Sequence, residues 1–177
     1  MAFFSMRSAF VPFCIAAPVL LAGCASAYGP GVDVALRPTV GSAVSGNIRF
    51  FQRKDVVRVT GEVRGLRPNG EHGFHIHERG NCTGGDGMSA GGHFNPDGGP
   101  HGKFGERPSH AGDLPNLLAD GNGVARVNFE TRTISVKNGV ADISGRGLIV
   151  DRDADDYKTQ PSGNSGPRLA CGVIAPI

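Results

Sequence analysis

The sequence predicts an all-β domain, a sandwich or barrel of about eight strands. Three observations indicate this fold class. First, 28 glycines and 12 prolines in 177 residues disfavour long helices and favour strands joined by turns. Second, short runs that alternate apolar and polar residues recur between turn residues. Third, the apolar residues keep no helical period over ten or more residues.

Each expected strand is an alternating run that stops at a turn signal. Pro38 ends the first run, Lys54-Asp55 marks the turn between the second and the third, and Pro68-Asn69-Gly70 precedes the fourth. The expected strands are residues 32–36, 47–51, 57–63, 72–77, 124–129, 140–144, 147–150 and 171–174. Two long polar stretches, 78–122 and 151–168, lack this alternation, and long ordered loops in a compact domain usually carry function.

The composition is that of one globular domain with a single core, since 39% of the residues are hydrophobic and 19% are charged. The formal net charge is only +2 and no run of Lys and Arg is present, so we expect no nucleic-acid partner. The histidines are more informative, because all six lie between His72 and His110.

Residues 9–22 form an apolar run that predicts a secretory leader. Arg7 is the only charged residue before Asp33, and the run ends in small residues. The run is also too short to span a bilayer as a helix of the mature protein.

The four residues Leu-Ala-Gly-Cys at positions 21–24 resemble the bacterial lipobox. The motif predicts a lipoprotein signal peptide at 1–23, a lipidated Cys24 that begins a tether at 24–31, and a folded domain at 32–177. We therefore expect a periplasmic protein that contacts a membrane only through its N-terminal lipid. Ala25 rather than Asp follows the cysteine, which favours the outer membrane. The alternative is an ordinary signal peptide with an incidental Cys24.

Four cysteines are present, and two of them are expected to form a disulfide. Cys14 leaves with the leader and Cys24 carries lipid, so Cys82 and Cys171 remain in an oxidising compartment. A disulfide between them closes a loop of roughly 90 residues and stabilises the fold by about 4 kcal/mol. The alternative, a pair of soft metal ligands, is disfavoured because neither cysteine has a CxxC partner.

Two histidine patterns predict metal binding. His75 and His77 are two positions apart in an expected strand, so their side chains share one face while His72 points to the other. The second pattern lies in the following polar stretch, where three imidazoles and a carboxylate satisfy a tetrahedral Zn²⁺. Its members are His93, His101, His110 and Asp113. The alternative is a set of surface histidines that serve turns and caps.

Four segments together resemble the copper,zinc superoxide dismutase family. They are Gly-Phe-His-Ile-His-Glu at 73–78, Gly-His-Phe-Asn-Pro at 92–96, His-Ala-Gly-Asp-Leu at 110–114 and Gly-Pro-Arg-Leu-Ala-Cys-Gly-Val-Ile at 166–174. The resemblance runs from about Val32 to the C-terminus, and Leu-Pro-Asn-Leu at 114–117 is similar to the bacterial branch. It implies an eight-stranded Greek-key β-sandwich with two long loops over copper and zinc, and superoxide as the substrate. The oligomeric state stays open, and a homodimer is possible.

The resemblance also implies roles for individual residues. The implied copper ligands are His75, His77 and His93, and the implied zinc ligands are His93, His101, His110 and Asp113. His93 would bridge the two metals and carry a proton. Asp155 would link a copper-ligand histidine to a zinc-ligand histidine, and Arg168 would guide superoxide to copper. Cys82 and Cys171 match the intrasubunit disulfide of the family.

One position departs from the family pattern. The family places a fourth copper histidine directly after an apolar strand, but here Asp151 follows Gly147-Leu148-Ile149-Val150. The flanking residues align without a gap, and no histidine follows His110. Asp151 either ligates copper or only caps a turn. A carboxylate is a harder ligand than an imidazole, so it should favour Cu(II), lower the potential and oppose the attraction that Arg168 exerts on an anion.

The sequence is therefore consistent with two functions. The first is a superoxide dismutase with reduced activity, and the second is a copper-poor, zinc-stabilised relative that binds metal or another partner.

Overall fold

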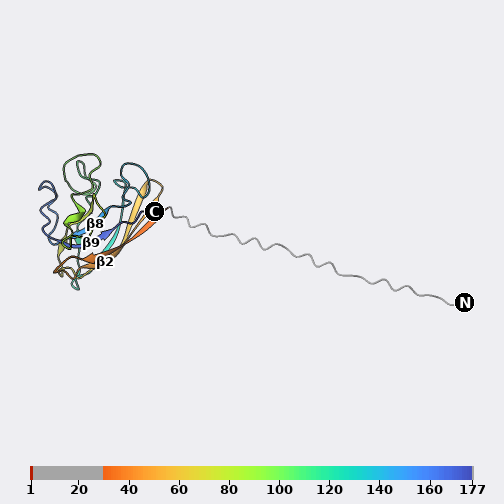
Figure 1. The fold of residues 1–177 in the computed structure, drawn as a ribbon, viewed down its shortest axis with the longest axis horizontal. Helices are drawn as coiled ribbons and strands as arrows, with labels where there is room; N and C mark the ends of the chain where they lie inside the picture. The colour runs from red at the N-terminus through yellow and green to blue at the C-terminus, as the bar shows by residue number, and fades with distance from the viewer. Residues whose placement is uncertain (2–29, 177) are drawn as a thin grey trace.

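The computed structural model describes Met1 and residues 30–176. Within this part of the chain it contains nine β-strands and one short 3₁₀ turn, η1, at Met88–Ala90. The strands are β1 (Gly31–Pro38), β2 (Ser45–Arg53), β3 (Val56–Arg64), β4 (Glu71–His72), β5 (Phe74–His77), β6 (Leu117–Leu118), β7 (Ala125–Thr131), β8 (Gly147–Asp151) and β9 (Arg168–Val173). The prediction of an all-β domain is confirmed (Figure 1).

Seven strands form one curled antiparallel sheet in the order β5-β8-β9-β1-β2-β3-β7, and β4 pairs with β6 beside it. Strand β1 joins the two halves of this sheet, β5-β8-β9 on one side and β2-β3-β7 on the other. Its residues 31–36 pair with β2, while Arg37 and Pro38 pair with β9. The order is not sequential: β3 lies next to β7 and β5 next to β8. These crossovers leave two long connections, residues 78–116 and 152–167, on which the polar residues concentrate.

The alternating pattern explains the core between the two halves. In β1 the buried positions alternate with outward ones, so Val32, Val34 and Leu36 face inward. Ile48 and Phe50 of β2 meet them in the same apolar cluster. Strands β5 and β8 are buried along their whole length, because the long connections cover the face that the core does not.

Two strand predictions were wrong in detail. Residues 140–144 form turns instead of a strand, because the Asp142 carboxylate accepts the backbone N–H groups of Lys137 and Ser144 and so competes with strand pairing. The expected strand at 72–77 is divided at Gly73: His72 pairs with Leu117 of β6, whereas Phe74 pairs with Val150 of β8. The short strand β6 was not predicted.

The predicted disulfide between Cys82 and Cys171 is confirmed, with an S–S distance of 2.04 Å and a sequence separation of 89 residues. The bond links the connection at residues 78–116 to strand β9. Both sulfurs are oxidised in this pairing, so the alternative of two metal-binding thiolates is wrong. Ala90 and Ile149 pack around the disulfide, on the same side of the sheet as the histidines of β5.

The predicted leader, the lipobox and Cys24 lie outside the described residues. In the part of the chain that is described, no helix has the length and apolar character needed to cross a membrane.

Candidate metal centre

Strand β5 brings the two histidine patterns together, because both arms of the long connection hydrogen-bond to its edge. The N–H of Phe94 donates to the Ile76 carbonyl at 2.8 Å, and the Ile76 N–H donates to the Gly112 carbonyl at 2.9 Å. A Cβ at position 112 would collide with the Ile76 carbonyl, so only glycine allows this approach. The neighbouring residues His93 and Asp113 are thereby placed beside His77 and His75.

The first cluster of possible metal ligands, which we call the zinc-side cluster, consists of His93, His101, His110 and Asp113. Nδ1 of the three rings lies 2.8, 3.1 and 3.3 Å from the same oxygen, Oδ1 of Asp113. Four donors around Zn²⁺ with bonds of about 2.0 Å are separated by about 3.3 Å. The observed spacing therefore fits a tetrahedral ion.

Two buried ring nitrogens in the zinc-side cluster provide a second indication. Among the described residues, Nδ1 of His101 and Nδ1 of His110 have no hydrogen-bond partner, although Oδ1 of Asp113 lies near both. A buried polar atom without a partner is costly, and a metal ion would supply the partner. The other carboxylate oxygen, Oδ2, is fixed by the N–H groups of Gly102 and His110 at 3.1 and 2.8 Å.

The second cluster, the copper-side cluster, consists of His75, His77 and His93. The rings of His75 and His93 are stacked with centroids 4.0 Å apart. Nδ1 of His77 donates to the Gly91 carbonyl at 2.9 Å, which leaves Nε2 as an acceptor. This buried atom has no hydrogen-bond partner in the part of the chain that the structure describes. His93 belongs to both clusters: its Nδ1 lies on Asp113, so Nε2 is the nitrogen left for the copper side.

Asp151 lies beside the copper-side cluster. Its Oδ2 is 2.9 Å from Nδ1 of His75, and the residue is only 5% exposed. The backbone of Asp151 is fixed on both sides, since its N–H donates to Gly73 and its carbonyl accepts a hydrogen bond from Nδ1 of His72 at 3.0 Å. Burial raises the pKa of the Asp151 carboxyl, while His75 opposes that rise. The carboxylate therefore points into the cluster.

Asp155 joins the two clusters. Its Oδ2 lies 2.9 Å from Nε2 of His75, and its Oδ1 lies 2.9 Å from Nε2 of His101. Burial lowers the pKa of both imidazoles, but hydrogen bonds to carboxylates outweigh it and raise the pKa of each ring to about 9. These contacts occupy the outer nitrogen of each ring and so direct the other nitrogen inward.

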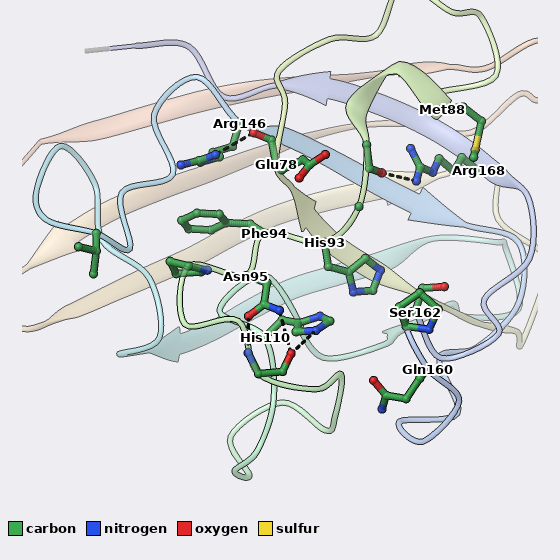
Figure 2. A pocket seen from close by; sticks show the side chains of 16 residues that line it. Glu78, Met88, His93, Phe94, Asn95, His110, Arg146, Gln160, Ser162 and Arg168 are labelled. Atoms are coloured by element: carbon green, nitrogen blue, oxygen red, sulfur yellow. Dashed lines mark hydrogen bonds between the residues drawn. The ribbon is translucent and has the colours of Figure 1, made fainter.

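Arg168 lines a cavity of about 880 Å³ together with His93 and His110. Its guanidinium donates to the carbonyls of Gly87 and Gly91, each at 2.6 Å, and is therefore held in place. Figure 2 draws the second of these bonds as a dashed line from Arg168 to a backbone oxygen. The Gly91 carbonyl also accepts from His77, so one backbone oxygen connects the arginine to the copper-side cluster. Burial lowers the pKa of Arg168, and the negative charge of Asp151 acts in the opposite direction.

Sequence reasoning missed two residues that hold the loops over the clusters. The Gln160 side chain accepts from the N–H of His101 and donates to its carbonyl, both at 2.9 Å. The Asn116 side chain does the same for Asp155, with both distances 3.0 Å. An amide in a polar loop gives no sequence signal of this role, because its partner lies about 40 to 60 positions away. The pocket view shows Gln160 below His93 (Figure 2).

Comparison with known proteins places these clusters in a family. Residues 44–174 match the family model described as copper/zinc superoxide dismutase (SODC). The chain belongs to this family. One curated relative is Superoxide dismutase [Cu-Zn] 2 of Aquifex aeolicus (strain VF5), which is 42% identical over 135 residues; the match covers 74% of this chain and 79% of the relative. Another is Superoxide dismutase [Cu-Zn] of Deinococcus radiodurans, which is 38% identical over 170 residues; the match covers 89% of this chain and 91% of the relative.

Solved structures of family-like proteins share the fold. A double mutant of a SOD-like protein from Bacillus subtilis superposes with a TM-score of 0.69 at 39% identity, covering 85% of this chain and 99% of that one. A crystal structure of the clock protein EA4 gives 0.73 at 37% identity, covering 82% and 95%. The expected Greek-key β-sandwich is confirmed by this likeness. The chain is thus an oxidoreductase of the superoxide dismutase family, and copper and zinc are the cofactors that the family implies.

Proposed function

We propose that this chain dismutates superoxide at a copper site in which Asp151 takes the place of one histidine, and that it does so more slowly than a four-histidine site. Two superoxide ions and two protons give O₂ and H₂O₂. The observation that carries the proposal is the contact of Asp151 Oδ2 with His75 Nδ1 at 2.9 Å, in the same cluster as the unpartnered Nε2 of His77.

The residues that would hold the metals are His75, His77, His93 and Asp151 for copper, and His93, His101, His110 and Asp113 for zinc. When bound, copper supplies the one-electron redox chemistry that dismutation needs. His93 would hold a proton at Nε2, the nitrogen that faces the copper side. Arg168 attracts the superoxide anion into the cavity, and its two carbonyl partners keep the positive charge there.

The expected reduction in rate follows from charge and ligand hardness. A carboxylate in the ligand set favours the oxidised ion and resists its reduction by the first superoxide. Asp151 also places a negative charge within electrostatic reach of Arg168, which weakens the attraction of an anionic substrate.

A second candidate function is supported by a specific contact. Both ring nitrogens of His75 are engaged by carboxylates, Asp151 on Nδ1 and Asp155 on Nε2, without any metal. A His75 ring whose two nitrogens are both satisfied without a metal supports a zinc-stabilised protein that binds metal or another partner and carries little copper.

Elemental analysis and a dismutation assay on one sample separate these two functions. The mature protein is expressed in a periplasm and then offered copper. One zinc and one copper per chain with measurable dismutation would support the enzyme. One zinc, little copper and no dismutation would overturn it in favour of the second candidate.

We also propose that the mature chain is a periplasmic lipoprotein of the bacterial branch, anchored through Cys24 and directed to the outer membrane by the absence of Asp after it. The Leu-Ala-Gly-Cys segment at 21–24 and the disulfide, which needs an oxidising compartment, support this location. Labelling cells with radioactive palmitate should mark the wild-type chain and not a Cys24→Ala variant. An unlabelled wild-type chain would contradict the proposal.

A further inference from the structure

The two metal clusters have the same chemical composition once Asp151 is counted. Each has three imidazoles and one buried carboxylate, with His93 shared between them. The zinc-side set is His93, His101, His110 and Asp113. The copper-side set adds Asp151, through its contact with His75, to the clustered histidines His75, His77 and His93. A four-histidine set is uncharged, whereas this copper-side set carries one negative charge.

The three histidines of the copper side lie close enough together to hold one ion, and Asp151 has the spacing of a fourth ligand to one of them, His75. Oδ2 of Asp151 lies 2.9 Å from Nδ1 of His75, and neighbouring donors with bonds of about 2.0 Å are separated by roughly 2.8–3.3 Å. Asp155 occupies the other nitrogen of His75, so Nδ1 is the atom that remains for a metal. Nε2 of His77 is buried and unpartnered, which is an independent sign that an ion belongs there.

The buried carboxylate distinguishes ions by charge. Coulomb attraction to one negative charge is twice as large for a dication as for a monocation, and the effect is strong where water is excluded. His75 is fully buried and Asp151 nearly so. Ligand type acts in the same direction, since tetragonal sites of nitrogen and oxygen suit Cu²⁺, whereas Cu⁺ prefers softer ligands.

We propose that the copper-side site selects its ion by oxidation state: it holds divalent ions, Cu²⁺ or Zn²⁺, and binds Cu⁺ much more weakly than a four-histidine site does. The inference rests on the ligand positions of the proposed function but not on turnover. It assigns Asp151 the role of the residue that determines metal specificity.

Two competition titrations on zinc-loaded mature protein test this inference. Cu⁺ is offered without oxygen against a chromophoric Cu⁺ chelator, and Cu²⁺ against a Cu²⁺ chelator. The variants are Asp151→His, which restores an imidazole, and Asp151→Asn, which keeps the shape and removes the charge. Asp153→Asn is the matched control, because that carboxylate belongs to the same loop and forms its ion pair with the exposed Arg152. Zinc content verifies that each variant is folded.

We expect the ratio of Cu²⁺ affinity to Cu⁺ affinity to fall by roughly tenfold or more in Asp151→His, since loss of a residue that orients or binds a metal changes affinity on that scale. For a one-electron couple each tenfold change corresponds to about 59 mV. Asp151→Asn should weaken Cu²⁺ binding more than Cu⁺ binding, because the lost charge attracts the dication twice as strongly. The electron paramagnetic resonance spectrum of Cu²⁺ should differ between wild type and Asp151→His and stay constant in the control.

Equal ratios in wild type and Asp151→His would overturn the inference, as would an Asp151→Asn variant that changes neither affinity. The dismutation assay on the same samples keeps the two proposals apart. A wild-type protein that turns over superoxide but shows no divalent preference contradicts only the metal selectivity. A protein with the preference but without turnover contradicts only the proposed enzyme.

Discussion

Oδ2 of Asp151 lies 2.9 Å from Nδ1 of His75, although the two residues are 76 positions apart in the sequence. Their contact follows from strand register. His75 of β5 is opposite Ile149 of β8, so Asp151, two positions further, projects from the same face at the diagonal position. A shift of one residue would send the carboxylate to the other face. The relationship makes position 151 the most informative site for substitution.

Asp151→His should raise the dismutation rate of copper-loaded protein by roughly tenfold, a change of about 1.4 kcal/mol in the barrier. The imidazole removes a negative charge near Arg168 and stabilises the reduced ion. The rate is measured by pulse radiolysis or stopped flow at equal copper content. Asp153→His serves as the control, and a rate as low as that of wild type would contradict the expected gain.

Arg168→Gln should lower kcat/KM for superoxide by roughly tenfold at low ionic strength and flatten its salt dependence, because a fixed positive charge focuses the field in the cavity. Glutamine can still donate to the Gly87 or Gly91 carbonyl. Arg146→Gln is a matched comparison, since Arg146 lines the same cavity but stacks on Phe94, 4.0 Å from its ring centroid. Equal losses in both variants would refute a special role for Arg168.

Removing the disulfide with Cys82→Ala and Cys171→Ala should lower the free energy of unfolding by about 4 kcal/mol, because the bond restricts the unfolded chain over 89 residues. Denaturant unfolding of zinc-loaded protein measures the change. Reduction of the wild-type protein should have a similar effect, whereas a loss below 1 kcal/mol would show that the loop holds its position by other contacts.

Zinc affinity should rise with pH up to about 9. Metal binding needs a neutral imidazole, and the carboxylates around His101 raise the pKa of its ring to about 9 in the metal-free protein, although burial alone would lower it. Below that pH, Zn²⁺ must displace a proton, so the affinity decreases as the pH falls. Competition with a zinc chelator between pH 6 and 9 measures this trend, and a pH-independent affinity would contradict it.

Alternation predicted the long strands well and failed where local polar contacts prevailed. Strands β1, β2, β3 and β7 lie close to the expected ranges, because their apolar residues alternate over five or more positions. Residues 140–144 alternate too, but Val140 is 81% exposed and Asp142 bonds the local backbone. Periodicity does not show whether side-chain hydrogen bonds to the local backbone will compete with strand pairing. Two-residue strands such as β6 are too short to show a period.

The sequence by itself determined the all-β class, the disulfide pair and the residues of the two metal clusters. The class depends on composition and alternation, the zinc-side residues on spacing within about 20 residues, and the pairing of His75 with His77 on side-chain parity along one strand. The disulfide pair, 89 residues apart, followed from assigning the other two cysteines to the leader and the lipid, and the place of His93 on the copper side followed from the family resemblance. Only the tertiary structure decided that the Asp151 carboxylate meets His75, and that Asn116 and Gln160 hold the loops. Those contacts depend on strand register and on loops that approach each other across long stretches of chain, and neither leaves a periodic trace in the sequence.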